Sequence, residues 1–125
     1  MKMLSTVPAT LVFMLALAPV FAAAAEDNLK TVADINQNMT KLAGQTVSAQ
    51  GKVVKVNNGI MRRNFVHVQD GTGDATSNNL IVTSKQTAKV GDQVAISGVV
   101  VLNRDFGGGY SYPLLIEDAS IEVKQ

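Results

Sequence analysis

The fold is decided by Gly51-Lys-Val-Val-Lys-Val56, the turn residues Asn57-Asn58-Gly59, and Asn64-Phe-Val-His-Val-Gln-Asp-Gly-Thr-Gly73. Apolar and polar residues alternate in the first and third stretches, which is typical of strands with one buried face. Asparagine and glycine tolerate the positive φ of a tight turn, and the Asp-Gly-Thr-Gly end supplies a second turn. This pattern predicts strands at about 46–56 and 63–70 that begin a small five-stranded barrel.

Three later segments continue the β pattern. Leu80-Ile-Val-Thr-Ser84 predicts a third strand, Gln93 to about Asn103 a fourth, and residues 110–117 a fifth that a tail at 119–123 could continue. Gly98 interrupts the fourth strand and suits a bulge or bend. Five strands with a short connection between the third and fourth favour an all-β Greek-key barrel over a sandwich, which usually has about seven strands.

The N-terminal region has the pattern of an export signal. Lys2 precedes an apolar run from about Leu11 to Phe21, and four alanines follow before the polar Glu26. This run is shorter than the roughly 20 apolar residues that span a bilayer, so it predicts a secretory signal peptide cleaved after residue 24 or 25. The predicted organisation is therefore a signal peptide at 1–25, an N-terminal segment at 26–45 and the barrel domain at 46–125. We expect a periplasmic or secreted protein with no stable membrane insertion after cleavage.

A short helix is expected within the N-terminal segment. Its apolar residues recur every three or four positions, at Leu29, Val32, Ile35, Met39 and Leu42. Asp34 is the predicted cap of the helical turns, and Gly44 is the predicted end.

Composition restricts the possible functions. The chain has no cysteine, which excludes disulfides, thiolate metal sites and thiol catalysis. Removing Lys2 with the signal peptide leaves ten basic and ten acidic residues, so the mature net charge is zero. A neutral exported domain lacks the basic footprint typical of nucleic-acid-binding proteins.

Residues 46 to about 117 resemble a known family. The motif positions are Gly51, Val53, Arg62, Arg63, Phe65, Val66, Val68, Asp70 and Gly73, and Val90-Gly-Asp-Gln-Val-Ala-Ile-Ser-Gly98 matches the entry to the fourth strand. They resemble the tRNA anticodon-binding and helicase-type OB-fold family. More closely, the chain is similar to small exported bacterial single-OB-fold proteins that share an Ile-Met-x-x-Asn-aromatic-x-His-x-Gln-Asp-Gly motif. Their aromatic residue is often Trp, and here it is Phe65. The resemblance implies an OB-fold and a base-stacking role for Phe65.

Strand alternation defines a candidate site. Val66 and Val68 are expected to point into the barrel. Phe65, His67 and Gln69 then lie on the outer face of the second and third strands, which OB-folds use for ligands. Arginines and aromatics of the two neighbouring loops would complete an anion-binding and stacking cleft. The candidate ligand-binding residues are Arg62, Arg63, Phe65, His67, Gln69, Arg104, Phe106 and Tyr110.

Structural interpretations of the same residues remain open. The arginines could be ordinary solvated loop charges, and Phe65 could pack under the N-terminal segment. Tyr110 and Tyr112 could belong to a barrel-end core. Asp70-Gly-Thr-Gly73 is explained best as a turn.

Neither catalysis nor a cofactor is expected. Glu117 and Asp118 should point to opposite faces of a strand, whereas acid–base pairs must converge on one reacting atom. His67 is the single histidine, which is poor material for a metal site.

Three functions fit these observations. The first is a non-enzymatic exported binding module for an extended or anionic ligand, single-stranded nucleic acid or oligosaccharide. The alternative is a periplasmic protein-interaction module in an envelope complex. A minor alternative is a copper or stress accessory protein that uses Met61 and His67.

Overall fold

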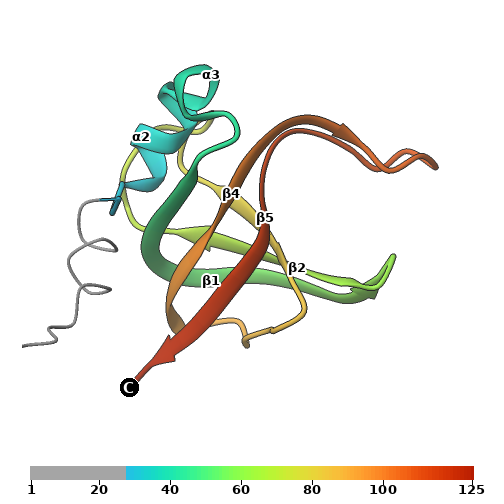
Figure 1. Cartoon of the computed structure of the whole chain (residues 1–125). Helices are drawn as coiled ribbons and strands as arrows, with labels where there is room; N and C mark the ends of the chain where they lie inside the picture. The colour runs from blue at the N-terminus through green and yellow to red at the C-terminus, as the bar shows by residue number, and fades with distance from the viewer. Residues whose placement is uncertain (1–27) are drawn as a thin grey trace, which may run out of the picture.

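The computed structural model describes residues 28–125, and the predicted signal peptide lies outside them. As predicted, the chain is mostly β with five strands, and the expected helical segment forms two short helices before them (Figure 1). The elements are α2 Val32–Gln37, α3 Met39–Leu42, β1 Thr46–Ile60, β2 Arg63–Gln69, β3 Leu80–Ser84, β4 Gln93–Asp105 and β5 Ser111–Lys124. The predicted tail at 119–123 continues β5, and β1 and β4 run farther than predicted.

The five strands form one closed sheet in the order β1-β2-β3-β5-β4. Neighbours are antiparallel except β3 and β5, which run parallel and meet at the single pair Val82 and Ile116. The β1–β2 and β4–β5 hairpins both project beyond the closed part, on the same side of the molecule (Figure 1).

The β1–β2 turn does not lie where the sequence predicts it. β1 continues through Asn57 to Ile60, which pairs with Arg63, so the turn consists of Met61 and Arg62 alone. Their φ angles are 52° and 65°, the geometry of a two-residue type I′ hairpin. Gly59, with a φ of 73°, lies in an irregularity of the ladder instead.

β4 and β5 change register beside Gly98, where the sequence predicts an irregularity. The pairs on either side are Ser97 with Ser120 and Val99 with Glu117, so the extra residue belongs to β5 rather than to β4. Asp118, in this bulge, has a φ of 52°. The carbonyl of Ala119, which follows Asp118, accepts a hydrogen bond from Ser84 at the end of β3.

The helical segment is confirmed, but its cap is not the predicted one. Thr31 is the N-cap residue, since its Oγ1 accepts a hydrogen bond from the Asp34 N–H. Val32 and Ile35 are fully buried, whereas Leu29 is 46% exposed. No helix among residues 28–125 is long and apolar enough to cross a membrane.

The main core lies inside the closed sheet, and α2 covers one end of it (Figure 1). Its members are the inward-facing aliphatic residues of all five strands together with the buried face of α2. The fully buried large ones include Ile35, Val47, Val53, Val66, Val68, Leu80, Val82, Ile96 and Ile116.

The predicted turn at Asp70 also caps α2 from a distance. Asp70 Oδ2 accepts a hydrogen bond from the Val32 N–H at 2.9 Å, and Thr72 Oγ1 accepts one from the Ala33 N–H at 3.0 Å. Thr72 Oγ1 itself donates to Asp70 Oδ1. Burial opposes ionisation of Asp70, but the hydrogen bonds from Thr72 and Val32 outweigh it and lower its pKa. The turn therefore supplies acceptors to N–H groups that a helix cannot satisfy internally.

We expect Asp70→Ala to lower the free energy of unfolding by about 1–2 kcal/mol, the usual cost of losing a helix cap. A lowered folded-state pKa means that the stabilisation is present above the unfolded value, near 3.9, and is lost as the pH falls through the folded-state value. Urea unfolding at several pH values checks both points. The stability difference between the parent and Asp70→Asn should shrink below about pH 4; a difference independent of pH would contradict the assignment.

Candidate functional site

Phe65 is 2% exposed although it lies on the face of β2 opposite the core residues Val66 and Val68. Phe106 and Tyr112 of the β4–β5 hairpin cover it, with ring centroids 5.9 and 5.5 Å from the Phe65 ring. The N-terminal segment is therefore not needed to explain its burial. In this conformation Phe65 offers no open ring face to a ligand.

Two arginines lie next to these rings, and both pair with the same buried carboxylate. Arg63 Nε lies 3.3 Å from Glu117 Oε1, and Arg104 Nε lies 3.4 Å from Glu117 Oε2. Both guanidinium groups also lie over the Phe106 ring, at 4.8 and 4.7 Å from its centroid, in cation–π geometry. Thr83 Oγ1 contacts Glu117 Oε1 at 3.4 Å. We name Phe65, Phe106, Tyr112, Arg63, Arg104, Glu117 and Thr83 the Glu117 cluster.

The Glu117 cluster occupies the space between the two hairpins. Glu117 is 7% exposed, so its charge depends on Arg63 and Arg104 for compensation. The expected cleft of arginines and aromatics is thus filled by the protein's own side chains.

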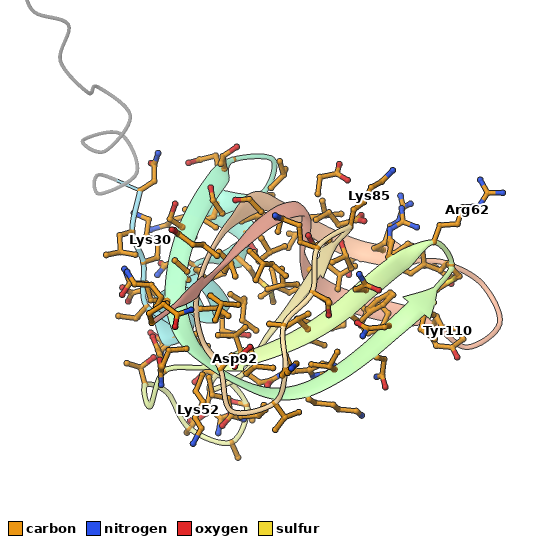
Figure 2. The ribbon with its side chains drawn as sticks, turned by 90° about the horizontal axis from the view of Figure 1, so that it is seen from below. Lys30, Lys52, Arg62, Lys85, Asp92 and Tyr110 are labelled. Atoms are coloured by element: carbon orange, nitrogen blue, oxygen red, sulfur yellow. The ribbon has the colours of Figure 1, made fainter. Side chains whose placement is uncertain are left out.

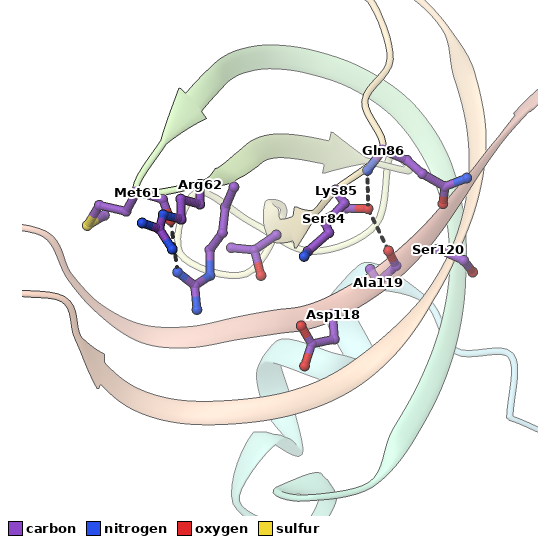
Figure 3. A pocket seen from close by; sticks show the side chains of 10 residues that line it. Met61, Arg62, Ser84, Lys85, Gln86, Asp118, Ala119 and Ser120 are labelled. Carbon is purple, nitrogen blue, oxygen red and sulfur yellow. Dashed lines mark hydrogen bonds between the residues drawn. The ribbon is translucent and has the colours of Figure 1, made fainter.

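An open groove of about 530 Å³ lies next to this cluster (Figure 3). Its walls come from the β1–β2 turn, the end of β3 and the β5 bulge. The lining residues are Met61, Arg62, Arg63, Thr83, Ser84, Lys85, Gln86, Asp118, Ala119 and Ser120. They include three cationic side chains and one carboxylate, and none of them is aromatic.

Hydrogen bonds fix the part of the groove where β3 and β5 diverge. Ser84 Oγ donates to the Ala119 carbonyl at 2.6 Å and accepts from the Gln86 N–H (Figure 3). Gln86 Oε1 accepts from the Ile121 N–H at 2.8 Å. These bonds bridge the two strands where direct pairing has ended.

Backbone strain concentrates in the same place. Among residues 28–125, four non-glycine residues have positive φ, and three of them, Met61, Arg62 and Asp118, line the groove. Such conformations cost free energy and cluster at functional sites. Their coincidence with the three-cation groove marks this region as the candidate site.

The remaining predicted residues do not converge on the groove. His67 Nδ1 lies 3.3 Å from Asn79 Nδ2, and burial, followed by the charge of Lys55, lowers the pKa of His67. Gln69 lines a separate hollow on another part of the surface. Tyr110 is 44% exposed at the end of the β4–β5 hairpin, on the same side as Arg62 and Lys85 (Figure 2).

Met61 and His67 are also separated. Arg63, next to the turn, and His67 are four positions apart along β2, which corresponds to roughly 13 Å of strand. Within residues 28–125 no group of three or more His, Asp or Glu side chains is arranged to hold a metal ion. The structure thus does not bring together the two copper ligands that the sequence suggests.

Sequence reasoning missed Lys85 and Asp118 as groove residues and Glu117 as the centre of the cluster. It did predict opposite faces for Glu117 and Asp118, and they do lie in different environments, one buried and one exposed. A register shift beside Gly98 is the one signal that could have directed attention to Asp118.

Comparison with known proteins does not assign this chain to a family. Neither the scan against protein-family models nor the search of curated proteins finds a match to this chain. The family resemblance therefore stays a prediction from the motif residues.

Proposed function

We propose that this chain is an exported, non-enzymatic binding module of the OB-fold class that holds an anionic ligand in the groove. The observation that carries the proposal is the lining itself, with Arg62, Arg63 and Lys85 facing a space that contains one carboxylate. The closed five-strand order, with β3 parallel to β5, supports the OB-fold, a five-stranded Greek-key barrel. The apolar segment and alanines of residues 1–25 support export.

The three cationic side chains would contribute to anion binding in different ways. Arg63 is held in place, because Nη1 donates to the Met61 carbonyl at 3.2 Å while Nε pairs with Glu117. A guanidinium fixed in this way loses little conformational freedom when it binds an anion. The exposed side chains of Arg62 and Lys85 have no ion pair or hydrogen bond within residues 28–125, so their charges are available to a ligand.

A binding role is proposed rather than a catalytic one because the groove presents no pair of acid and base. Asp118 is its one carboxylate, and His67 lies outside it. Positively charged donors without a proton-transfer partner can hold and orient an anion but supply no general acid–base step.

The site predicts a specific loss of anion affinity. Arg62→Ala and Lys85→Ala should each weaken binding of a single-stranded oligonucleotide or an acidic oligosaccharide, and each should lower the salt slope of log K by about 1 for the oligonucleotide. Lys52→Ala is the matched control, because Lys52 lies on the other side of the molecule (Figure 2). Fluorescence anisotropy over a salt series measures both quantities. No binding of any such anion by the parent at low salt would refute the proposal.

A further inference from the structure

Asp118 is the feature of the groove that simple anion binding does not explain. Its side chain is exposed and lines the groove with Arg62, Arg63 and Lys85, yet it makes no ion pair or hydrogen bond with any of residues 28–125. In Figure 3 the Asp118 carboxylate stands apart from Arg62, and no ion pair or hydrogen bond joins it to Lys85. Its backbone is held in the left-handed region by the β5 bulge.

An unpaired carboxylate in an anion groove restricts what can bind there. An ionised carboxylate only accepts hydrogen bonds, so it repels a ligand that presents nothing but acceptors. A DNA backbone is such a ligand. A ligand with hydroxyl groups beside its anionic groups can instead donate to Asp118 while its anions meet the arginines.

The groove offers no aromatic surface on which nucleic-acid bases could stack. No aromatic residue lines it. Phe65, Phe106 and Tyr112 contact one another, and Arg63 and Arg104 lie over Phe106. Single-stranded nucleic acids gain much of their affinity from aromatic rings on which bases stack. A ligand recognised through charge and hydroxyl groups fits the lining better.

We infer that the groove binds an acidic oligosaccharide, with Asp118 accepting hydrogen bonds from its hydroxyl groups and Arg62, Arg63 and Lys85 binding its carboxylates. This inference rests on the proposed function and narrows its ligand class. Asp118 is a specificity determinant in this arrangement, since it lowers the affinity for anions that lack hydroxyl donors.

The test compares two polyanions that carry the same charged group. An oligogalacturonate has carboxylates and hydroxyls, and an acrylate oligomer of equal charge has carboxylates alone. By titration calorimetry on the mature protein, we expect the first to bind about 10-fold more tightly, the range of a hydrogen bond to a charged group. In Asp118→Asn this ratio should fall several-fold, because the charged acceptor is lost. Removing a negative charge should raise the affinity for both polyanions, and this general gain does not change the ratio of the two affinities.

Asp118→Asn should fold like the parent, because asparagine tolerates the left-handed conformation of residue 118. Arg62→Ala is the companion variant and should weaken both ligands without changing their ratio. Equal affinities in the parent, an unchanged ratio in Asp118→Asn, or tighter binding of oligothymidylate than of the galacturonate would overturn the inference while leaving anion binding intact. If none of these anions binds, the proposed function itself fails.

Discussion

Gly98→Ala is expected to lower the free energy of unfolding by about 3 kcal/mol, at the upper end of the usual cost of overpacking. A Cβ at this position would lie 2.7 Å from Ile116 Cγ2, 2.8 Å from the Glu117 carbonyl oxygen and 3.0 Å from Ala119 Cα. Two of these atoms belong to the backbone of β5, so a side-chain rotation cannot relieve the contact. β5 would have to move away from β4 at the bulge.

Urea unfolding followed by circular dichroism measures this loss. Ser97→Ala is the matched control, since Ser97 is the half-buried neighbour in the same strand and the change adds no atom. Any movement of β5 would also displace Glu117 and Asp118, so Gly98→Ala should weaken anion binding in the protein that stays folded. A loss of stability below about 1 kcal/mol would show that β4 and β5 separate easily, contrary to the close packing at Gly98.

The strands were predictable because each has alternating or continuous apolar residues between recognisable turns. β3 is found at the predicted residues 80–84, and the register shift lies beside Gly98 as expected. The β1–β2 turn was not predictable in the same way. Met61 and Arg62 carry a Cβ and are not the asparagine or glycine that usually marks positive φ, so the sequence pointed to Asn57-Asn58-Gly59 instead.

The candidate site was predictable in part. Arg62 and Arg63 lie at the groove because Arg62 belongs to the turn between two predicted strands and Arg63 follows it. The burial of Phe65 depends on Phe106 and Tyr112 reaching back from a hairpin about 40 residues later in the chain, and strand alternation carries no information on such a contact. Lys85 and Asp118 line the same groove because β3 and β5 run parallel at a single pair, a property of the closed topology rather than of either segment.

Glu117→Gln is expected to lower the free energy of unfolding by about 2–3 kcal/mol, somewhat less than the 3–5 kcal/mol for a fully buried ion pair. The reduction follows from the partial exposure of the partners, whose side chains are 30% exposed for Arg63 and 42% for Arg104. Arg104 Nε is itself buried without a hydrogen bond, so Glu117 compensates it through charge alone. Without that charge, two guanidinium groups remain together over Phe106.

Asp118→Asn is the matched control, because it removes the next carboxylate along the chain from an exposed position; its effect should stay within about 0.5 kcal/mol. A triple variant, Arg63→Met with Glu117→Leu and Arg104→Met, replaces all three charged groups. It should recover most of the stability that Glu117→Leu alone loses, because an apolar cluster leaves no charge uncompensated. Urea unfolding of the four variants separates these cases. If Glu117→Gln unfolds like the parent, water already compensates both arginines and the Glu117 cluster does not hold the two hairpins together.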